Sequence, residues 1–132
     1  MELQAAMRKV DDCLIWGGRL DEKEFDMKLQ QSLFTLAVYL THTSGSSVVT
    51  RAMSNATPVL ASDVGGLRDY LGKAGILIPP GDPSCLAVTI ESLLGNTNLL
   101  EALGKEGRER AVSLLSWNTI AQQTANVYEA HA

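Results

Sequence analysis

The stretch from Thr57 to Pro83, TPVLASDVGGLRDYLGKAGILIPPGDP, constrains the fold more than any other part of the sequence. Its apolar run 58–62 is followed by an aspartate and two glycines, and then by helix-forming residues over 67–71. A second apolar run, 76–78, ends at two prolines. Asp82 and Pro83 suit a helix start, because the carboxylate accepts orphan helix amides and proline fits the first helical position. The stretch therefore predicts a strand, a helix, a second strand and a helix that begins at Pro83.

The residues before this stretch alternate between helical patterns and short apolar runs. They predict a helix over 2–9, a strand over 13–16, a helix from Asp21 to about Leu33, a strand over 34–41 and a helix over 46–54. Such alternation is typical of a parallel sheet whose strands are connected by helices. The sequence thus predicts an α/β fold, a Rossmann-like parallel sheet of about four strands flanked by helices, in a single domain over 1–132.

The residues after Pro83 predict three amphipathic helices. The first ends at Gly95, the second carries leucines between 99 and 115, and Ser116 caps the third. In this last helix we expect Ile120, Val127 and Tyr128 to face inward.

Charge and cysteine content exclude several classes of function. The net charge is −4, and neither nucleic acid nor an acidic membrane surface attracts such a chain without a segregated basic face. Lys105, Arg108 and Arg110 alternate with glutamates, so we interpret them as a solvated helix side. Cys13 and Cys85 are expected to be free thiols, and no metal site is predicted. The sequence has neither a signal-peptide pattern nor a membrane-length apolar run, which predicts a cytoplasmic location and no membrane span.

An ordered set of motifs occupies the segments 52–53, 57–66, 74–83, 107–110 and 116–117. This set resembles, in its residues and its order, the C-terminal half of a family 4 retaining glycosyltransferase of the GT-B fold. It implies a partial GT-B C-terminal domain that binds a nucleotide sugar, with a UDP-sugar or GDP-sugar as the donor substrate and no further cofactor.

In this family, two glutamates spaced as E-x7-E contact the donor sugar and the ribose. The equivalent positions here are Thr43 and Arg51, and no glutamate occurs between Glu24 and Glu91. Arg51 is a donor-only cation, so it can pair with a phosphate but cannot replace a carboxylate acceptor. We interpret it either as a phosphate contact or as an exposed helix arginine, and no catalytic residue is predicted.

The loop 42–47 leads directly into a helix, where backbone amides and hydroxyls favour a phosphate. Alternatively, one of its serines only caps that helix. Together with the glycine turn after the next strand, it forms the predicted nucleotide-sugar or phosphate site, which consists of Thr43, Ser44, Gly45, Ser46, Ser47, Arg51, Gly65 and Gly66.

Two functions follow from this sequence. In the first, the chain is the donor-binding half of a retaining hexosyl transferase, inactive alone, with the acceptor bound by a separate N-terminal half. In the second, it is a non-catalytic interaction or regulatory module derived from a glycosyltransferase, which associates with a partner or forms a homo-oligomer.

Overall fold

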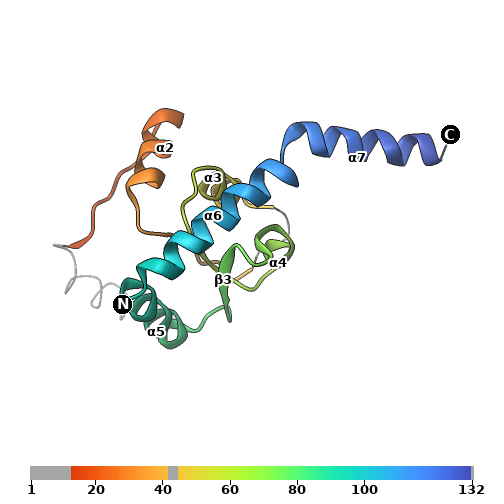
Figure 1. The fold of residues 1–132 in the computed structure, drawn as a ribbon. Coiled ribbons are helices and arrows are strands. Elements are labelled where there is room, and N and C mark those ends of the chain that lie inside the picture. The colour runs from red at the N-terminus through yellow and green to blue at the C-terminus, as the bar shows by residue number, and fades with distance from the viewer. Residues whose placement is uncertain (1–12, 42–44, 132) are drawn as a thin grey trace.

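A computed structural model describes residues 13–41 and 45–131, which fold into one parallel sheet with helices around it (Figure 1). Along the chain the elements are α2 (Glu22–Gln31), β1 (Thr35–Ala37), α3 (Ser47–Ser54), β2 (Val59–Ser62), α4 (Leu67–Leu71), β3 (Gly75–Ile78), α5 (Pro83–Leu94), α6 (Thr97–Ser113) and α7 (Trp117–Ala130).

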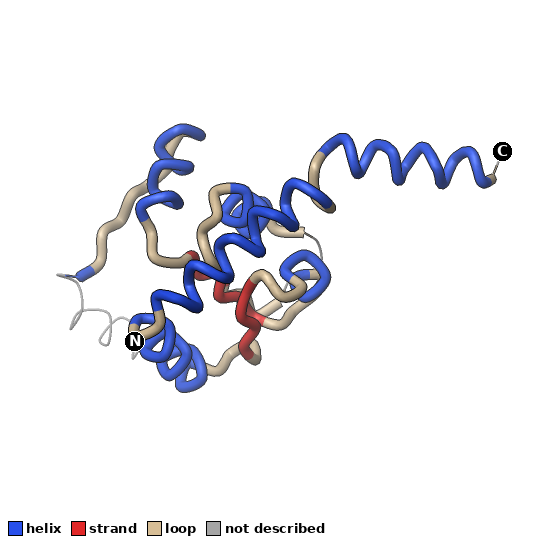
Figure 2. Tube along the Cα trace, viewed as in Figure 1, coloured by secondary structure: helices blue, strands red, loops and turns tan. Residues whose placement is uncertain are grey.

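The sheet has the order β1-β2-β3, and both pairings are parallel. All four residues of the central strand β2 are buried. Val59 and Ala61 belong to a core cluster with side chains of α3 and α4, whereas Leu60 belongs to a second cluster with side chains of α5 and α6. Because successive strand residues face opposite sides, the two clusters are the two faces of the sheet. Figure 2 shows the three strands together in the middle of the surrounding helices.

The stretch from Thr57 to Pro83 folds as predicted. β2, α4 and β3 occupy the predicted runs, and α5 begins at Pro83. The Asp82 carboxylate accepts a hydrogen bond from the amide of Cys85 at 2.8 Å, which confirms the predicted cap. The predicted helices over 46–54 and from Asp21 are also present, with Ser46 and Asp21 as their N-caps.

The predicted strand over 13–16 is wrong. These residues are irregular, and Ile15 and Trp16 are 94% and 78% exposed. A strand needs a neighbour for its backbone hydrogen bonds, and in the described residues none pairs with this segment. The sheet therefore has three strands where about four were expected. The helix predicted over 2–9 lies outside the described residues.

The prediction that Ile120, Val127 and Tyr128 of the last helix face inward is also wrong. α7 begins at Trp117 after the predicted cap, Ser116, but none of its residues is buried. Figure 1 shows why, since α7 leads away from the sheet and its covering helices. Beyond the first turn of α7 its large apolar side chains are exposed, Val127 to 60% and Tyr128 to 75%.

The basic residues of α6 are more than a solvated helix side. The Arg108 guanidinium donates to the carbonyl of Ser54, the last residue of α3. Arg110 donates to the carbonyl of Tyr70 at 2.7 Å and also to that of Asp69. Helices end in carbonyls without intrahelical partners, so these arginines cap α3 and α4. By contrast, Lys105 lies 4.0 Å from Glu109 and both side chains are exposed.

Among the described helices, none is long and apolar enough to cross a membrane.

Two glycines of α6 offer a matched test of how closely this helix approaches α3. A Cβ on Gly104 would overlap the backbone carbonyl oxygen of Ala56, whereas one on Gly107 would make an ordinary contact with Met53 at 3.6 Å. We expect Gly104→Ala to lower the free energy of unfolding by about 1–3 kcal/mol, because backbone must move. Gly107→Ala should raise it by about 0.5–1 kcal/mol through helix propensity. Urea denaturation of both variants measures this, and equal effects would contradict the close approach.

Candidate functional site

The carboxyl ends of the three strands meet at one edge of the sheet, which is where ligands bind in open α/β folds. Hydrogen bonds join the ends of neighbouring strands. The hydroxyl of Ser62 accepts from the amide of Tyr39 at 3.0 Å, and the amide of Asp63 donates to the carbonyl of Ile78 at 2.8 Å. The loops that follow the strands are therefore held in fixed positions relative to one another.

The start of α3 supplies two of the predicted site residues. Ser46 is buried, and its hydroxyl accepts from the amide of Val49 at 3.4 Å and lies 3.3 Å from the hydroxyl of Tyr39. This serine is thus the N-cap. Ser47 is exposed as the first helical residue. Thr43 and Ser44 lie outside the described residues, so their part in the site stays a prediction.

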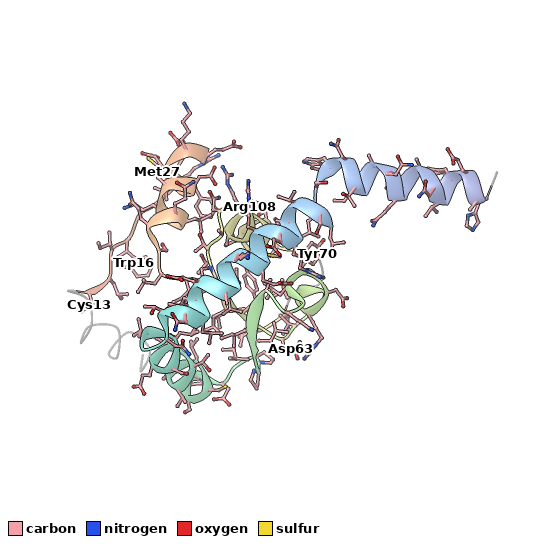
Figure 3. All side chains as sticks on the ribbon, in the orientation of Figure 1. Cys13, Trp16, Met27, Asp63, Tyr70 and Arg108 are labelled. Atoms are coloured by element: carbon pink, nitrogen blue, oxygen red, sulfur yellow. The ribbon has the colours of Figure 1, made fainter. Side chains whose placement is uncertain are left out.

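Tyr70 of α4 connects the two predicted glycine turns. A Cβ on Gly45 would overlap its hydroxyl, and a Cβ on Gly66 would lie 3.8 Å from its ring. Gly65, with φ of 54°, makes the turn from β2 into α4. The structure therefore brings Gly45, Gly66 and the start of α3 together around one tyrosine ring, labelled in Figure 3. Tyr70 was not among the predicted site residues, and its one signal in the sequence is its position four residues after Gly66 in the short helix.

Arg51 is engaged by α2. Its Nε donates to the carboxylate of Asp26 at 2.7 Å and its Nη2 donates to the carbonyl of Glu22 at 2.9 Å. The guanidinium carbon also lies 5.4 Å from the ring centre of Phe25, a cation–π distance. Of the two interpretations of Arg51, a phosphate contact and an exposed helix arginine, neither describes this geometry. The side chain holds α2 against α3.

This pair shifts the ionisation of both partners. The hydrogen bond from Arg51 lowers the pKa of Asp26 below the ordinary 3.8, against a smaller opposing effect of desolvation, and the amide of Asn55 adds to the lowering. The same bond raises the pKa of Arg51.

Asp63 at the end of β2 is also paired. Its carboxylate accepts from Nε of Arg68 at 3.1 Å and from a second nitrogen of the same guanidinium. This aspartate stabilises the turn after β2 by pairing with Arg68. Among the site residues that the structure describes, the carboxyl edge therefore has no unpaired acid. In residues 13–41 and 45–131 no cluster of histidine, cysteine, aspartate or glutamate could hold a metal ion.

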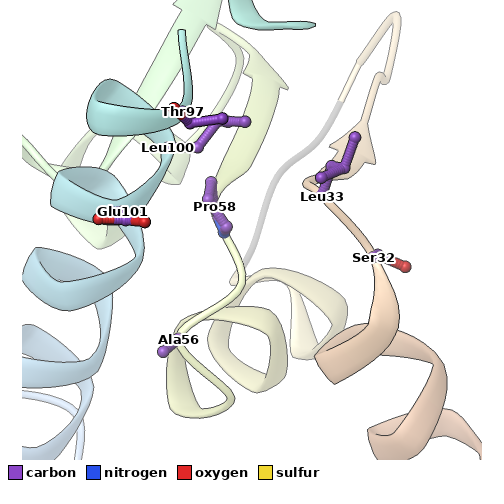
Figure 4. A pocket seen from close by; sticks show the side chains of 7 residues that line it. All are labelled: Ser32, Leu33, Ala56, Pro58, Thr97, Leu100 and Glu101. Atoms are coloured by element: carbon purple, nitrogen blue, oxygen red, sulfur yellow. The ribbon is translucent and has the colours of Figure 1, made fainter.

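Several hollows open on the surface of the described residues, and three of them adjoin the sheet or α6. One of about 440 Å³ lies over the ends of β1 and β3 and is largely apolar, with Tyr39, Leu40 and Pro79 in its wall. A groove of about 840 Å³ runs between α3, α4, α6 and the start of α7, where Ser47, Arg51, Tyr70 and Trp117 line it. The third, of about 260 Å³, lies between the end of α2 and the start of α6 (Figure 4), at the opposite edge of the sheet from the predicted site.

The contact between Gly45 and Tyr70 is testable by a double-mutant cycle. We expect Gly45→Ala to cost about 1–3 kcal/mol of unfolding free energy, because the new methyl group meets the phenol. Tyr70→Ala should relieve most of that cost, which gives a coupling of about 0.5–3 kcal/mol in chemical denaturation. Gly66→Ala is the control, since its methyl group makes only a 3.8 Å contact with the same ring. Additive effects of Gly45→Ala and Tyr70→Ala would contradict the contact.

The pair between Asp26 and Arg51 predicts a pH dependence of stability. The pKa of Asp26 is lower in the folded chain than in the unfolded chain. The pair therefore contributes its full stabilisation of the fold at pH values above the pKa of Asp26 in the unfolded chain. This stabilisation is lost as the pH falls through the lowered folded value. We expect the stability difference between wild type and Asp26→Asn to be constant near neutral pH and to shrink in acid. Denaturation at a series of pH values measures it.

Glu22→Gln is the matched control for Asp26→Asn. The carboxylate of Glu22 is 90% exposed and 3.9 Å from Arg51, and exposed pairs of this kind contribute little. A stability loss in Glu22→Gln equal to that in Asp26→Asn would contradict the assigned pairing.

The chain matches the family described as "Glycosyl transferases group 1" over residues 1–96. It is 40% identical over 81 residues to MMP alpha-(1->4)-mannosyltransferase of Mycolicibacterium hassiacum. This aligned stretch covers 59% of this chain and 20% of that protein. The chain is also 29% identical over 128 residues to glycogen synthase of Mycobacterium tuberculosis. Here the aligned stretch covers 95% of this chain and 30% of the relative.

A solved structure, sucrose-phosphate synthase from Thermosynechococcus elongatus, superposes with a TM-score of 0.80 at 28% identity over 98% of this chain and 33% of that one. The chain thus spans a third or less of the length of each of these proteins. The parallel sheet with its flanking helices is the corresponding part of a GT-B fold. By sequence and by fold, the chain belongs to the group 1 glycosyl transferases.

Proposed function

We propose that this chain is the donor side of a retaining glycosyl transfer, with a UDP-sugar or GDP-sugar as its ligand. One observation carries the proposal: the exposed start of α3 and the Gly65-Gly66 turn lie together at the carboxyl edge of the sheet, around Tyr70. The first amides of a helix lack intrahelical partners and lie at the positive end of its macrodipole. A diphosphate fits such a place.

The charge of the site limits the activity that we propose. The family's two glutamates are replaced by Thr43 and Arg51, and Arg51 is occupied by Asp26. Without these acceptors, contacts to the sugar and to the ribose are lost while contacts to the diphosphate are retained. We therefore propose weak donor binding and no sugar transfer by this chain alone. A separate half of the transferase would bind the acceptor.

A second candidate is a non-catalytic interaction module, which a different observation favours. On β1 and the loop after it, Leu36, Val38 and Leu40 are 46%, 42% and 75% exposed, and the apolar residues of α7 are exposed as well. Exposed apolar surface on an edge strand and on a helix is typical of an interaction site. Under this proposal the chain binds a partner or a second copy of itself.

Donor binding is tested by nuclear magnetic resonance titration with UDP-glucose, GDP-mannose and inorganic phosphate. We expect the amide signals of Gly45, Ser46, Ser47, Gly65 and Gly66 to shift at millimolar ligand. If neither nucleotide sugar shifts these amide signals, the first proposal is overturned. If inorganic phosphate shifts them as much as the nucleotide sugars do, the proposal is reduced to anion binding.

A matched pair of variants separates binding from stability. Ser47→Asp places a carboxylate at the first position of α3, which should stabilise the fold by about 0.3–1 kcal/mol but repel a diphosphate. Thr97→Asp makes the same change at the first position of α6, far from the site, and should stabilise without loss of binding. Retained binding in Ser47→Asp would place the ligand elsewhere.

A further inference from the structure

The phenol hydroxyl of Tyr70 is a hydrogen-bonding group at the carboxyl edge that the described fold does not use. Within the part of the chain that the structure describes, this hydroxyl has no hydrogen-bond partner. Of the other two tyrosines, Tyr39 lies 3.3 Å from the hydroxyl of Ser46, and Tyr128 is 75% exposed on α7. Tyr70 is partly buried, and a buried phenol usually has a partner for its hydroxyl. It therefore presents a donor that is available to a ligand.

The side chain of Tyr70 is held in place by its surroundings. Nε of Arg110 donates to its backbone carbonyl at 2.7 Å. Its ring lies beside Gly66, and its hydroxyl lies against Gly45, where a Cβ would overlap it. Gly45 is followed directly by Ser46, the N-cap of α3. The hydroxyl is thus fixed next to the backbone from which α3 begins, and a donor that is fixed before binding loses little entropy when a ligand arrives.

The arginines on α3 and α4 that could also serve an anion are already engaged. Arg51 pairs with Asp26, and Arg68 pairs with Asp63. To reach a phosphate, either guanidinium would have to leave a carboxylate, which would then repel the ligand. The neutral hydroxyl of Tyr70 has no acid to leave. A hydroxyl that donates to an ionised oxygen makes a short and strong hydrogen bond, so Tyr70 is the better suited of these side chains.

We propose that the Tyr70 hydroxyl donates a hydrogen bond to a phosphate oxygen of the ligand that binds at the carboxyl edge. This inference rests on the first proposed function, and it adds a side-chain contact to a site otherwise made of backbone amides. The chain advances at most about 3.6 Å per residue. The amide of Ser47, two residues after Gly45, is therefore within about 7 Å of the backbone that the hydroxyl touches. One diphosphate can contact both donors.

The test compares wild type with Tyr70→Phe, which removes the hydroxyl and keeps the ring beside Gly66. Both proteins are titrated with UDP-glucose and with inorganic phosphate, and the amide signals of Ser47 and Gly66 are followed by nuclear magnetic resonance. We expect both signals to shift in the variant as in wild type, but half-saturation should require roughly 10-fold more ligand. Without ligand, the Ser47 amide should have the same chemical shift in both proteins, which shows that the start of α3 is unchanged.

Two controls separate a contact with the ligand from an effect on the fold. Tyr128→Phe makes the same change on α7, where the side chain is exposed, and should bind as wild type does. In addition, 3-fluorotyrosine can be incorporated at all three tyrosines. The fluorine signal that disappears in Tyr70→Phe should shift when UDP-glucose is added to wild type, whereas the signal of Tyr128 should not.

Equal affinities of wild type and Tyr70→Phe overturn the inference and leave the donor proposal intact, since wild type still binds. Tighter binding by Tyr70→Phe or by Tyr70→Ala also overturns it, because the ring would then obstruct the site. If wild type binds neither nucleotide sugar nor phosphate, the donor proposal fails and the assigned role of Tyr70 fails with it. The affinity of wild type therefore tests the proposed function, and the ratio of the two affinities tests Tyr70.

Discussion

The close approach of α6 to α3 is the constraint on which the rest of this structure depends. Gly104 of α6 lies against the carbonyl of Ala56, just after the end of α3, and Gly107 rests on Met53 within α3. The same helix then caps the ends of α3 and α4 through Arg108 and Arg110. The N-termini of α3 and α4 adjoin the loops at the carboxyl edge of the sheet. Because α6 holds the C-termini of the same two helices, it fixes the geometry of the candidate site from a distance.

Local sequence signals predicted the elements whose ends are specified by their own residues. Asp82 with Pro83, Ser46 and Ser116 each cap the helix that was expected after them. The central strand was predictable for the same reason, since an apolar run between a proline and a glycine turn has few alternatives. These signals act within a few residues and need no knowledge of the tertiary structure.

The errors arise where the outcome depends on distant partners. The apolar residues 13–16 have the composition of a strand, but no strand lies beside them in the described structure. α7 has an amphipathic pattern, yet the pattern does not say where its apolar side is covered. Arg51 pairs with Asp26, 25 residues earlier in the chain, and the contact of Tyr70 with Gly45 joins two loops. Of the predicted site, the structure brings together the glycines and Ser46 but turns Arg51 toward α2.

Several of the residues that maintain this fold lie outside the set expected to bind the donor. Gly104, Arg110 and the helix caps position the carboxyl edge. In addition, the pairing of Arg51 with Asp26 converts a position of expected donor contact into one that fastens α2 to α3. The absence of glutamate between Glu24 and Glu91 is therefore compatible with a stable GT-B half, because folding and donor binding place separate demands on the sequence. Under the donor-binding proposal, backbone amides rather than carboxylates would hold the ligand of this chain.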